Sequence, residues 1–277
     1  MHMEQAVRRI LLFSLVLMAC TACRKGVRLT AAQQAANQLI ETDIPVQTLD
    51  SANVTNAVNG FYVCLPAHYK ETTKSYPLLV SLHGGGQTGS ADSDLRLLLN
   101  DGIAQTIQTK KFLPSFTVNG QNFSFIVLCP QFNGFPSSQQ VEDFILFARR
   151  RYRVDASRVY LTGLSMGGIV CSKMGGDFTA GLAAIVPMSG TVSDSAVCQH
   201  VARGKLPVWV FHNKADKVVD VGFPIGYVSL INRFNPTYHP RLTLFNSDAH
   251  DAWTLPLDPG YREEGKNIYE WMLQYAR

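Results

Sequence analysis

Charged side chains are scarce in this sequence: they make up 17% of the 277 residues, against 46% that are hydrophobic. Disordered chains need the opposite balance, so we expect one folded domain with a sizeable core. The formal net charge is only +4, and no run of Lys or Arg alternates with aromatic residues. The composition therefore gives little support to nucleic-acid binding.

Cysteine is also sparse, with six residues in the chain. After the N-terminal segment there remain Cys64, Cys129, Cys171 and Cys198. No two of these four have the C-x-x-C spacing of zinc or redox sites, so the cysteines give no support to a metal site. The sequence elsewhere implies no other cofactor. Cys64 and Cys129 lie in apolar runs where a free buried thiol is common, and their pairing stays open.

The N-terminus has the pattern of a signal peptide over residues 1–19, because Arg8 and Arg9 precede an apolar stretch too short to span a bilayer. Leu17-Met18-Ala19-Cys20 resembles the lipobox of bacterial lipoproteins, in which the cysteine becomes the acylated N-terminus. We therefore expect export and attachment to a membrane through Cys20, on the periplasmic side or the cell surface. Cys23, after Ala22, is a competing acceptor, and an ordinary cleaved signal peptide is the alternative.

Residues 20–56 are rich in Ala, Gln, Thr and Asn without a sustained apolar period, which predicts a tether. The folded domain is then expected over 57–277. Within it, short apolar runs predict strands at 61–65, 77–82, 125–129, 158–162, 182–188, 207–211 and 241–245.

Helical periodicity separates these strands. The side chains of Val141, Phe144, Ile145 and Ala148 share one helix face, and a second stripe closes the chain from Ile268 to Tyr275. Strands and helices in alternation predict the α/β class, with a mostly parallel, doubly wound sheet and helices on both faces.

Ser165 lies in a sequence pattern that is typical of a catalytic nucleophile. Gly163 to Gly167 read G-x-S-x-G between a predicted strand and a helical stretch, which is the pattern of a nucleophile elbow with Ser165 at its tip. The flanking glycines allow the tight turn, and the amide of Met166 is a candidate donor to an oxyanion.

A serine hydroxyl needs a base, and the base needs a third group to orient it. After such an elbow the chain order is nucleophile, acid, histidine. His250 follows the strand 241–245 in a loop at the edge where Ser165 emerges, so it is the expected base. His212 precedes the acid candidates, and His239 enters a strand at the opposite edge.

The expected acid is Asp216, in the loop after the strand 207–211. Asp220 lies four residues later in the same loop and is the alternative. Asp248 and Asp251 flank His250 too closely in the chain to reach its ring, so we expect them to stabilise the loop.

His83-Gly84-Gly85-Gly86 follows the strand 77–82 and is similar to the H-G-G-G motif that supplies oxyanion donors. We expect the amide of Gly85, or alternatively Gly86, to act with that of Met166. His83 itself is expected to fix the loop.

At this point the chain resembles bacterial α/β-hydrolase esterases related to polyhydroxybutyrate depolymerase, feruloyl esterase and the so-called predicted peptidases. The resemblance covers residues 60–275 and depends on L-H-G-G-G, V-L-C-P-Q, R-V-Y-L-T-G-L-S-M-G-G, V-W-V-F-H-N-K-A-D-K-V-V and H-D-A-W. It implies the α/β-hydrolase fold and the same three residues, Ser165, Asp216 and His250. Asn213 and Ala249 depart from it, because the family usually has Gly at both positions.

These patterns predict a carboxylic-ester hydrolase that works through an acyl-enzyme. The one candidate cap is the segment 222–238, so we expect an open cleft suited to a bulky ester, such as an acylated carbohydrate. Phe132, Phe135 and Trp253 are the candidates to line it. A serine peptidase with the same triad, or a non-catalytic carbohydrate-binding surface lipoprotein, are the alternatives.

Overall fold

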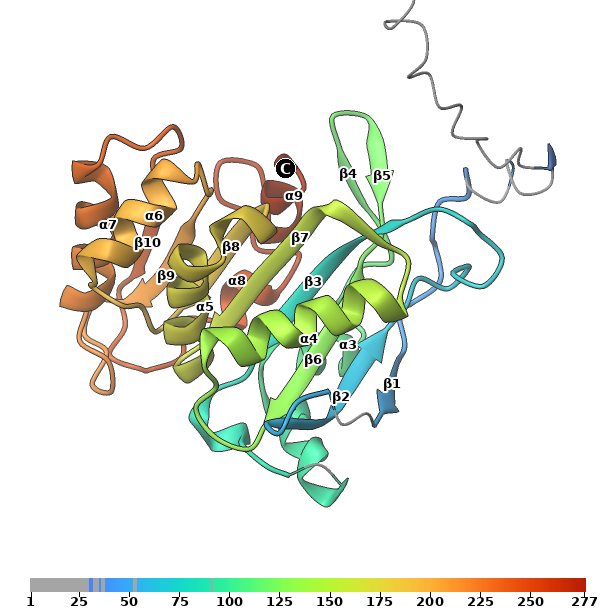
Figure 1. Ribbon diagram of the computed structural model, residues 1–277, viewed down its shortest axis with the longest axis horizontal. Coiled ribbons are helices and arrows are strands. Elements are labelled where there is room, and N and C mark those ends of the chain that lie inside the picture. Colours follow the sequence, from blue (N-terminus) through green and yellow to red (C-terminus); the bar gives the residue numbers. More distant parts are fainter. Residues whose placement is uncertain (1–29, 32–34, 36–37, 52–53, 91) are drawn as a thin grey trace, which may run out of the picture.

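The computed structural model describes residues 30–31, 35, 38–51, 54–90 and 92–277 (Figure 1). The expected signal peptide, Cys20 and Cys23 lie outside these residues, so their roles stay predictions. None of the helices in the described part of the chain is long and apolar enough to cross a membrane.

A central eight-stranded sheet has the order β1-β2-β6-β3-β7-β8-β9-β10. The strands from β6 to β10 in this order run parallel, whereas β1 and β2 pair antiparallel, as do β2 and β6. The predicted mostly parallel sheet is thus confirmed. The strands are β1 Gln47–Asp50, β2 Val58–Cys64, β3 Tyr76–Leu82, β6 Ile126–Phe132, β7 Val154–Leu164, β8 Ala184–Met188, β9 Trp209–Asn213 and β10 Arg241–Phe245.

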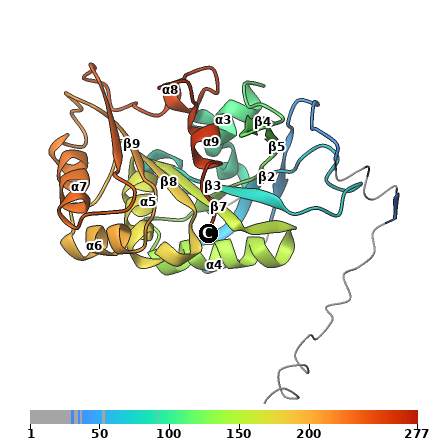
Figure 2. The same ribbon diagram turned by 90° about the horizontal axis from the view of Figure 1, so that it is seen from above.

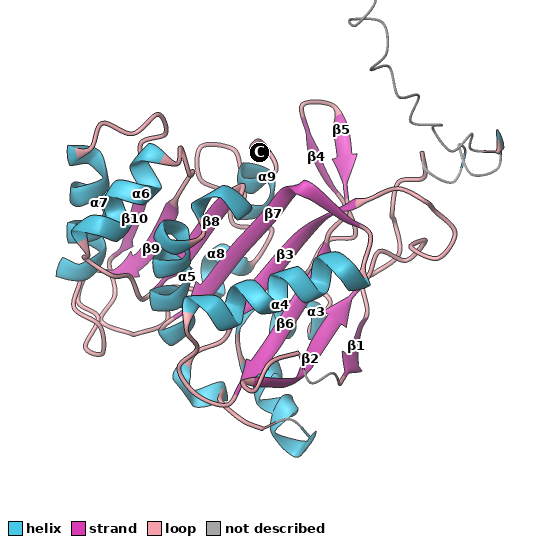
Figure 3. Ribbon diagram, in the orientation of Figure 1, coloured by secondary structure: helices cyan, strands magenta, loops and turns pink. Residues whose placement is uncertain are grey.

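Helices cover both faces of the sheet, as Figure 2 shows from above and Figure 3 shows by type of secondary structure. One face carries α4 (Ser138–Arg151), α5 (Met166–Asp177), α6 (Ser195–Arg203) and α7 (Gly222–Arg233). The other carries α3 (Gly102–Gln108), α8 (Thr254–Leu257) and α9 (Ile268–Met272). Short 3-10 turns complete the chain as η1 (Gly85–Gln87), η2 (Asp92–Asn100) and η3 (Thr179–Gly181).

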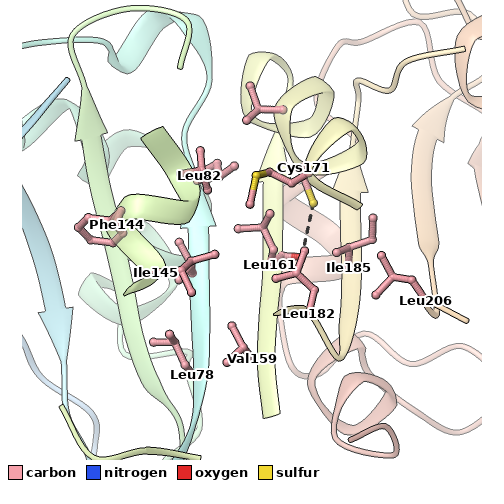
Figure 4. Close-up of a cluster of buried hydrophobic side chains, with 14 of the residues drawn as sticks. Leu78, Leu82, Phe144, Ile145, Val159, Leu161, Cys171, Leu182, Ile185 and Leu206 are labelled. Atoms are coloured by element: carbon pink, nitrogen blue, oxygen red, sulfur yellow. Dashed lines mark hydrogen bonds between the residues drawn. The ribbon is translucent and has the colours of Figure 1, made fainter. Parts of the chain in front are cut away.

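Two apolar clusters form the core, one on each face of the sheet. In β3, Leu78 and Leu82 belong to the cluster under α4 and α5, whereas Leu79 belongs to the other. This alternation explains why the strand is a continuous apolar run: side chains on both faces are buried. Figure 4 shows the first cluster, where the thiol of Cys171 donates to the Leu161 carbonyl at 3.5 Å.

All four cysteines of the domain are free and buried. Burial raises the pKa of the Cys64 and Cys129 thiols to about 12. These groups therefore stay protonated and pack as apolar side chains.

The sheet begins earlier than the sequence predicts. Residues 20–56 are expected to be a tether, but β1 lies within them and pairs with β2 from Gln47 opposite Cys64 to Asp50 opposite Phe61. Ahead of β1, the buried carboxylate of Glu41 accepts hydrogen bonds from the amide and Nδ1 of His68 at 3.1 and 2.8 Å. The short, polar edge strand Gln-Thr-Leu-Asp carries no apolar run, so the pattern could not indicate it.

A hairpin of β4 (Phe116–Val118) and β5 (Gln121–Phe123) was also not predicted. Its turn is Asn119-Gly120, and both residues have positive φ, +51° and +75°. Asn-Gly between alternating residues is the strongest short-range hairpin signal, so this element could have been found.

The candidate cap at 222–238 is not a lid. Its helix α7 is the crossover between the parallel strands β9 and β10, and it buries Tyr227 and Ile231 in the core. A crossover connection packs its helix onto a sheet face, which leaves this segment on one side of the molecule.

Candidate active site

Ser165 occupies the turn between β7 and α5, with φ +53° and ψ −117°. Close backbone approach enforces this geometry. A Cβ at Gly163 would lie 2.2 Å from the Gly167 carbonyl oxygen, and one at Gly167 would lie 2.3 Å from that of Leu82. The amide of Ser165 donates to the Met188 carbonyl at 2.9 Å, which ties the turn to the neighbouring strand. The strained turn holds the hydroxyl at the carboxyl end of the sheet.

The structure brings Ser165, His250 and Asp216 together, although 85 and 34 residues separate the bonded pairs in the chain. His250 Nδ1 lies 2.8 Å from Asp216 Oδ2, and Nε2 lies 2.8 Å from Ser165 Oγ. A carboxylate can only accept, so Nδ1 carries the proton and the neutral ring accepts the serine proton at Nε2. The spatial arrangement predicted from chain order is therefore observed.

The carboxylate of Asp216 is inaccessible to solvent, and both of its oxygens accept hydrogen bonds. Its Oδ1 accepts from the amides of Val218 and Val219 at 2.8 and 3.1 Å. Burial raises the pKa of Asp216, but these bonds and that from His250 outweigh it and hold the pKa below its usual value. An ionised carboxylate favours the Nδ1–H tautomer of His250.

The alternative acid, Asp220, is wrong for this arrangement. Its Oδ1 accepts from the amide of Gly222 at 2.7 Å, next to the start of α7, and the ring of His250 bonds to Asp216 instead. Of the two acids flanking His250, Asp251 caps the following turn by accepting from the amides of Trp253 and Thr254, as expected for a loop-stabilising residue. Asp248 pairs with Lys217 at the surface.

His212, excluded as the base, lies behind the acid. It is fully buried, and its Nε2 donates to the Val219 carbonyl at 2.9 Å while lying 3.5 Å from Asp216 Oδ2. Both contacts help to fix the turn that carries Asp216.

The expected oxyanion loop is fixed by His83. Its Nε2 accepts from the amide of Phe132 at 2.9 Å, so its Nδ1 donates to the Gly84 carbonyl at 2.7 Å. The amide of Gly84 in turn donates to Gln87 Oε1 at 3.1 Å. His83 therefore bonds the backbone of the glycine loop to that of Phe132, as expected for a residue that fixes the loop.

The amides of Gly85 and Met166 donate to no protein group in the described part of the chain. Met166 is the first residue of α5, where an amide has no partner within its helix. A Cβ at the preceding Gly84 would lie 3.6 Å from Ser165 Cβ, so the glycine loop runs beside the nucleophile. Donation to an anion stays a prediction for both amides, and Gly86 stays the alternative to Gly85.

The three residues predicted to line the cleft, Phe132, Phe135 and Trp253, differ in how far they are exposed. Phe132 is wrong as a substrate contact, because it ends β6 and is 1% exposed, packed in the core beside His83. Phe135 is 62% exposed, and contact with a substrate stays a prediction for it. Trp253 does lie beside the base, with its ring edge-on to that of His250, but it is only 8% exposed.

Sequence reasoning did not predict the roles of Ser189 and Asn213, whose side chains bond the backbone around His250. Their contacts join loops that are far apart in the chain, and no local pattern signals them.

No protein-family model matches the chain. Among curated proteins, dipeptidyl peptidase 4 of Felis catus is 29% identical over 158 residues, which are 54% of this chain but only 20% of that protein. The chain thus spans about a fifth of the length of that relative.

Solved structures match over more of the chain. A thermostable esterase superposes with a TM-score of 0.57 at 21% identity, covering 86% of this chain and 64% of the other. A ferulic acid esterase gives a TM-score of 0.52 at 16% identity, covering 76% and 93%. Together with the strand order and the nucleophile turn, these likenesses show that the chain has the α/β-hydrolase fold.

Proposed function

We propose that this protein is a serine hydrolase of carboxylic esters, with Ser165 as nucleophile, His250 as general base and acid, and Asp216 as the group that orients His250. The observation that carries the proposal is the bridging imidazole, 2.8 Å from both the hydroxyl and the carboxylate. Hydrogen-bonded serine, histidine and acid in this order are the arrangement that activates a hydroxyl at neutral pH.

In the first half of the reaction, Ser165 Oγ attacks the ester carbonyl carbon while its proton passes to His250 Nε2. The buried carboxylate of Asp216 stabilises the imidazolium that forms. The tetrahedral intermediate then collapses, the C–O bond to the alcohol breaks, and His250 gives its proton to the departing oxygen. The acyl group stays on Ser165.

In the second half, water attacks the acyl carbon and gives a proton to His250, and the carboxylic acid leaves as Ser165 recovers its proton. Both tetrahedral intermediates place negative charge on the former carbonyl oxygen. The free amides of Met166 and Gly85 are the donors we assign to it, and one such donor is commonly worth about 3 kcal/mol of barrier.

The surroundings of the triad favour an ester on a bulky carrier. The side chain of His250 is 20% exposed, so the described part of the chain does not cover it completely. The segment that could have formed a cap packs on the sheet instead. Val218, whose amide donates to Asp216 Oδ1, has a 70% exposed apolar side chain on the same loop as Asp216. An acylated carbohydrate fits such an open surface, and Trp253 and Phe135 are the aromatic contacts we propose for it.

A peptidase with the same triad is the second candidate, favoured by the likeness to dipeptidyl peptidase 4. Ester cleavage needs less activation of the leaving group, so esters are the first substrates to test. Parallel assays with acetyl, feruloyl and hydroxybutyryl esters and with dipeptide p-nitroanilides separate the two: a larger kcat/KM for the anilides would favour the peptidase.

We also propose that the mature protein is exported and anchored through a lipid on Cys20. Metabolic labelling with an alkyne fatty acid tests this, because Cys20→Ala should abolish incorporation and Cys23→Ala should not. The opposite pattern would make Cys23 the anchor.

The direct test of function is hydrolysis of p-nitrophenyl acetate by the folded protein. We expect turnover that Ser165→Ala reduces by at least about 10³-fold while the circular dichroism spectrum is unchanged. Absence of turnover with every ester and anilide would contradict the proposal and favour the carbohydrate-binding lipoprotein.

A further inference from the structure

Asn213, the last residue of β9, holds the loop that carries His250. Its side chain is buried, 1% exposed, and its Nδ2 donates to the carbonyls of Ala249 and Asp251 at 2.8 and 2.9 Å. These two carbonyls lie on either side of His250. One amide group thus bonds the backbone immediately before and after the base.

Ser189, directly after β8, bonds the same loop. Its Oγ donates to the His250 carbonyl at 2.7 Å and accepts from the amide of Ala252 at 3.2 Å. The residue is fully buried and has φ +50°, a conformation that is costly for a residue with a side chain. Such strain persists where surrounding contacts hold it. Here the hydroxyl bonds the loop that carries His250, and the amide of Ser189 donates to the Phe211 carbonyl of β9 at 2.9 Å.

Together Asn213 and Ser189 bond four consecutive residues of the loop, 249–252. They lie at the carboxyl ends of β8 and β9, which are neighbouring parallel strands of the central sheet. His250 is thus held at two places. The side chains of Asn213 and Ser189 bond the backbone of its loop, and Asp216 bonds its ring at Nδ1.

We propose that Asn213 and Ser189 are positioning residues, which fix the backbone of His250 so that Nε2 stays within hydrogen-bond reach of Ser165. This role rests on the proposed function. Asn213 and Ala249 are the two positions where the sequence departs from the glycines of the esterases it resembles, and here they contact each other. A glycine at 213 would leave the carbonyls of Ala249 and Asp251 without this donor.

A positioning role makes a kinetic prediction that a purely stabilising role does not. Loss of the Asn213 amide in Asn213→Ala should lower kcat for p-nitrophenyl acetate by about 10²-fold with KM unchanged, since small displacements of a catalytic group cost this much. Ser189→Ala should act in the same direction. It serves as a second variant should Asn213→Ala fail to fold.

Asn267 offers a matched control. It is also a fully buried asparagine, and its Nδ2 donates to the Pro259 carbonyl at 3.1 Å while its Oδ1 accepts from the amide of Glu270 at the start of α9. Asn267→Ala should lose stability of the same order but keep kcat. If Asn267→Ala and Asn213→Ala lose kcat equally, the positioning role is contradicted.

Proton NMR gives a readout that needs no substrate. The Nδ1 proton shared with Asp216 should give a low-field resonance, assigned by its absence in His250→Ala. We expect this resonance to weaken or shift in Asn213→Ala and Ser189→Ala and to stay unchanged in Asn267→Ala. An unchanged resonance and an unchanged kcat in Asn213→Ala would overturn the proposal. An inactive wild-type protein with the expected changes in the resonance would contradict the proposed function but retain the positioning contact.

Discussion

Trp253 packs edge-on against His250, with ring centroids 5.3 Å apart and ring planes at 85°. Its indole Nε1 donates to Asp101 Oδ1 at 3.1 Å, at the residue that precedes α3. The ring of the proposed base is therefore supported on one side by a side chain anchored to a different part of the fold. We expect this contact to limit rotation of the imidazole away from Ser165.

The first prediction tests that support. An edge-on aromatic pair contributes about 1 kcal/mol, so Trp253→Ala should lower kcat for p-nitrophenyl acetate by about five- to tenfold. Trp253→Phe keeps the aromatic edge but loses the bond to Asp101, and it should lose less activity. Steady-state kinetics on both variants decides this, and equal activity of Trp253→Ala and wild type would refute the supporting role.

The second prediction separates the two acids of the loop after β9. Asp216→Asn keeps the shape but presents an amide where the carboxylate accepts from His250 Nδ1, which favours the wrong tautomer. We expect kcat to fall by about 10⁴-fold, as in serine proteases that carry the same change. Asp220→Asn should stay near wild type, because Asp220 bonds only the backbone at Gly222 in the described structure. The reverse result would identify Asp220 as the acid.

The third prediction concerns the packing of the nucleophile turn. A Cβ at Gly167 would lie 2.3 and 2.7 Å from the backbone oxygens of Leu82 and His83, so Gly167→Ala should destabilise the fold by about 2 kcal/mol or more. A Cβ at Gly134 meets nothing within 4 Å, so Gly134→Ala should stay within about 0.5 kcal/mol of wild type. Urea unfolding measures both, and equal midpoints would argue against the close approach of the turn to β3.

The fourth prediction is a pH dependence of stability from His83. Burial lowers the pKa of His83, and the bond to the Gly84 carbonyl offsets only part of that effect. The unfolded chain then binds a proton near pH 6.5 that the folded chain does not bind, so stability falls as pH drops below about 6.5. His83→Asn removes this titration, and its free energy of unfolding should change less between pH 7.5 and 5. Equal slopes for the two proteins would rule out His83 as the source.

The lowered pKa of Asp216 makes stability depend on pH in a different pH range from that of His83. Its contribution to stability is present above its unfolded pKa of about 3.9 and is lost as pH falls further, through the folded pKa. Measurements above pH 5 therefore report on His83 without interference from Asp216.

Much of the sheet could be predicted because buried parallel strands are apolar on both faces. The strand 241–245 was predicted with the bounds of β10, and β8 and β9 were placed within two residues at each end. Edge β1 was not predicted because three of its four residues are polar and the fourth, Leu49, is exposed, so periodicity gives a weak signal. The hairpin β4–β5 was missed although its Asn119-Gly120 turn is a recognisable signal.

The three proposed catalytic residues could be found because their chemistry and chain order restrict the choice to a few positions. The residues that hold them could not. The amides of Val218 and Val219, the hydroxyl of Ser189 and the amide of Asn213 act through contacts between separate loops, and such contacts depend on the folded geometry. Phe132 failed for a related reason, since its strand extends three residues beyond the predicted end at 129 and takes the ring into the core.

The central claim is that the imidazole of His250 activates the hydroxyl of Ser165. A fluorophosphonate probe, followed by peptide mass spectrometry, tests it without assuming a substrate. We predict that the probe modifies Ser165 in the wild-type protein and that His250→Ala slows this labelling by at least about 10³-fold while the fold is retained. Labelling of Ser165 at the same rate in both proteins, or modification of another residue in place of Ser165, would contradict the account.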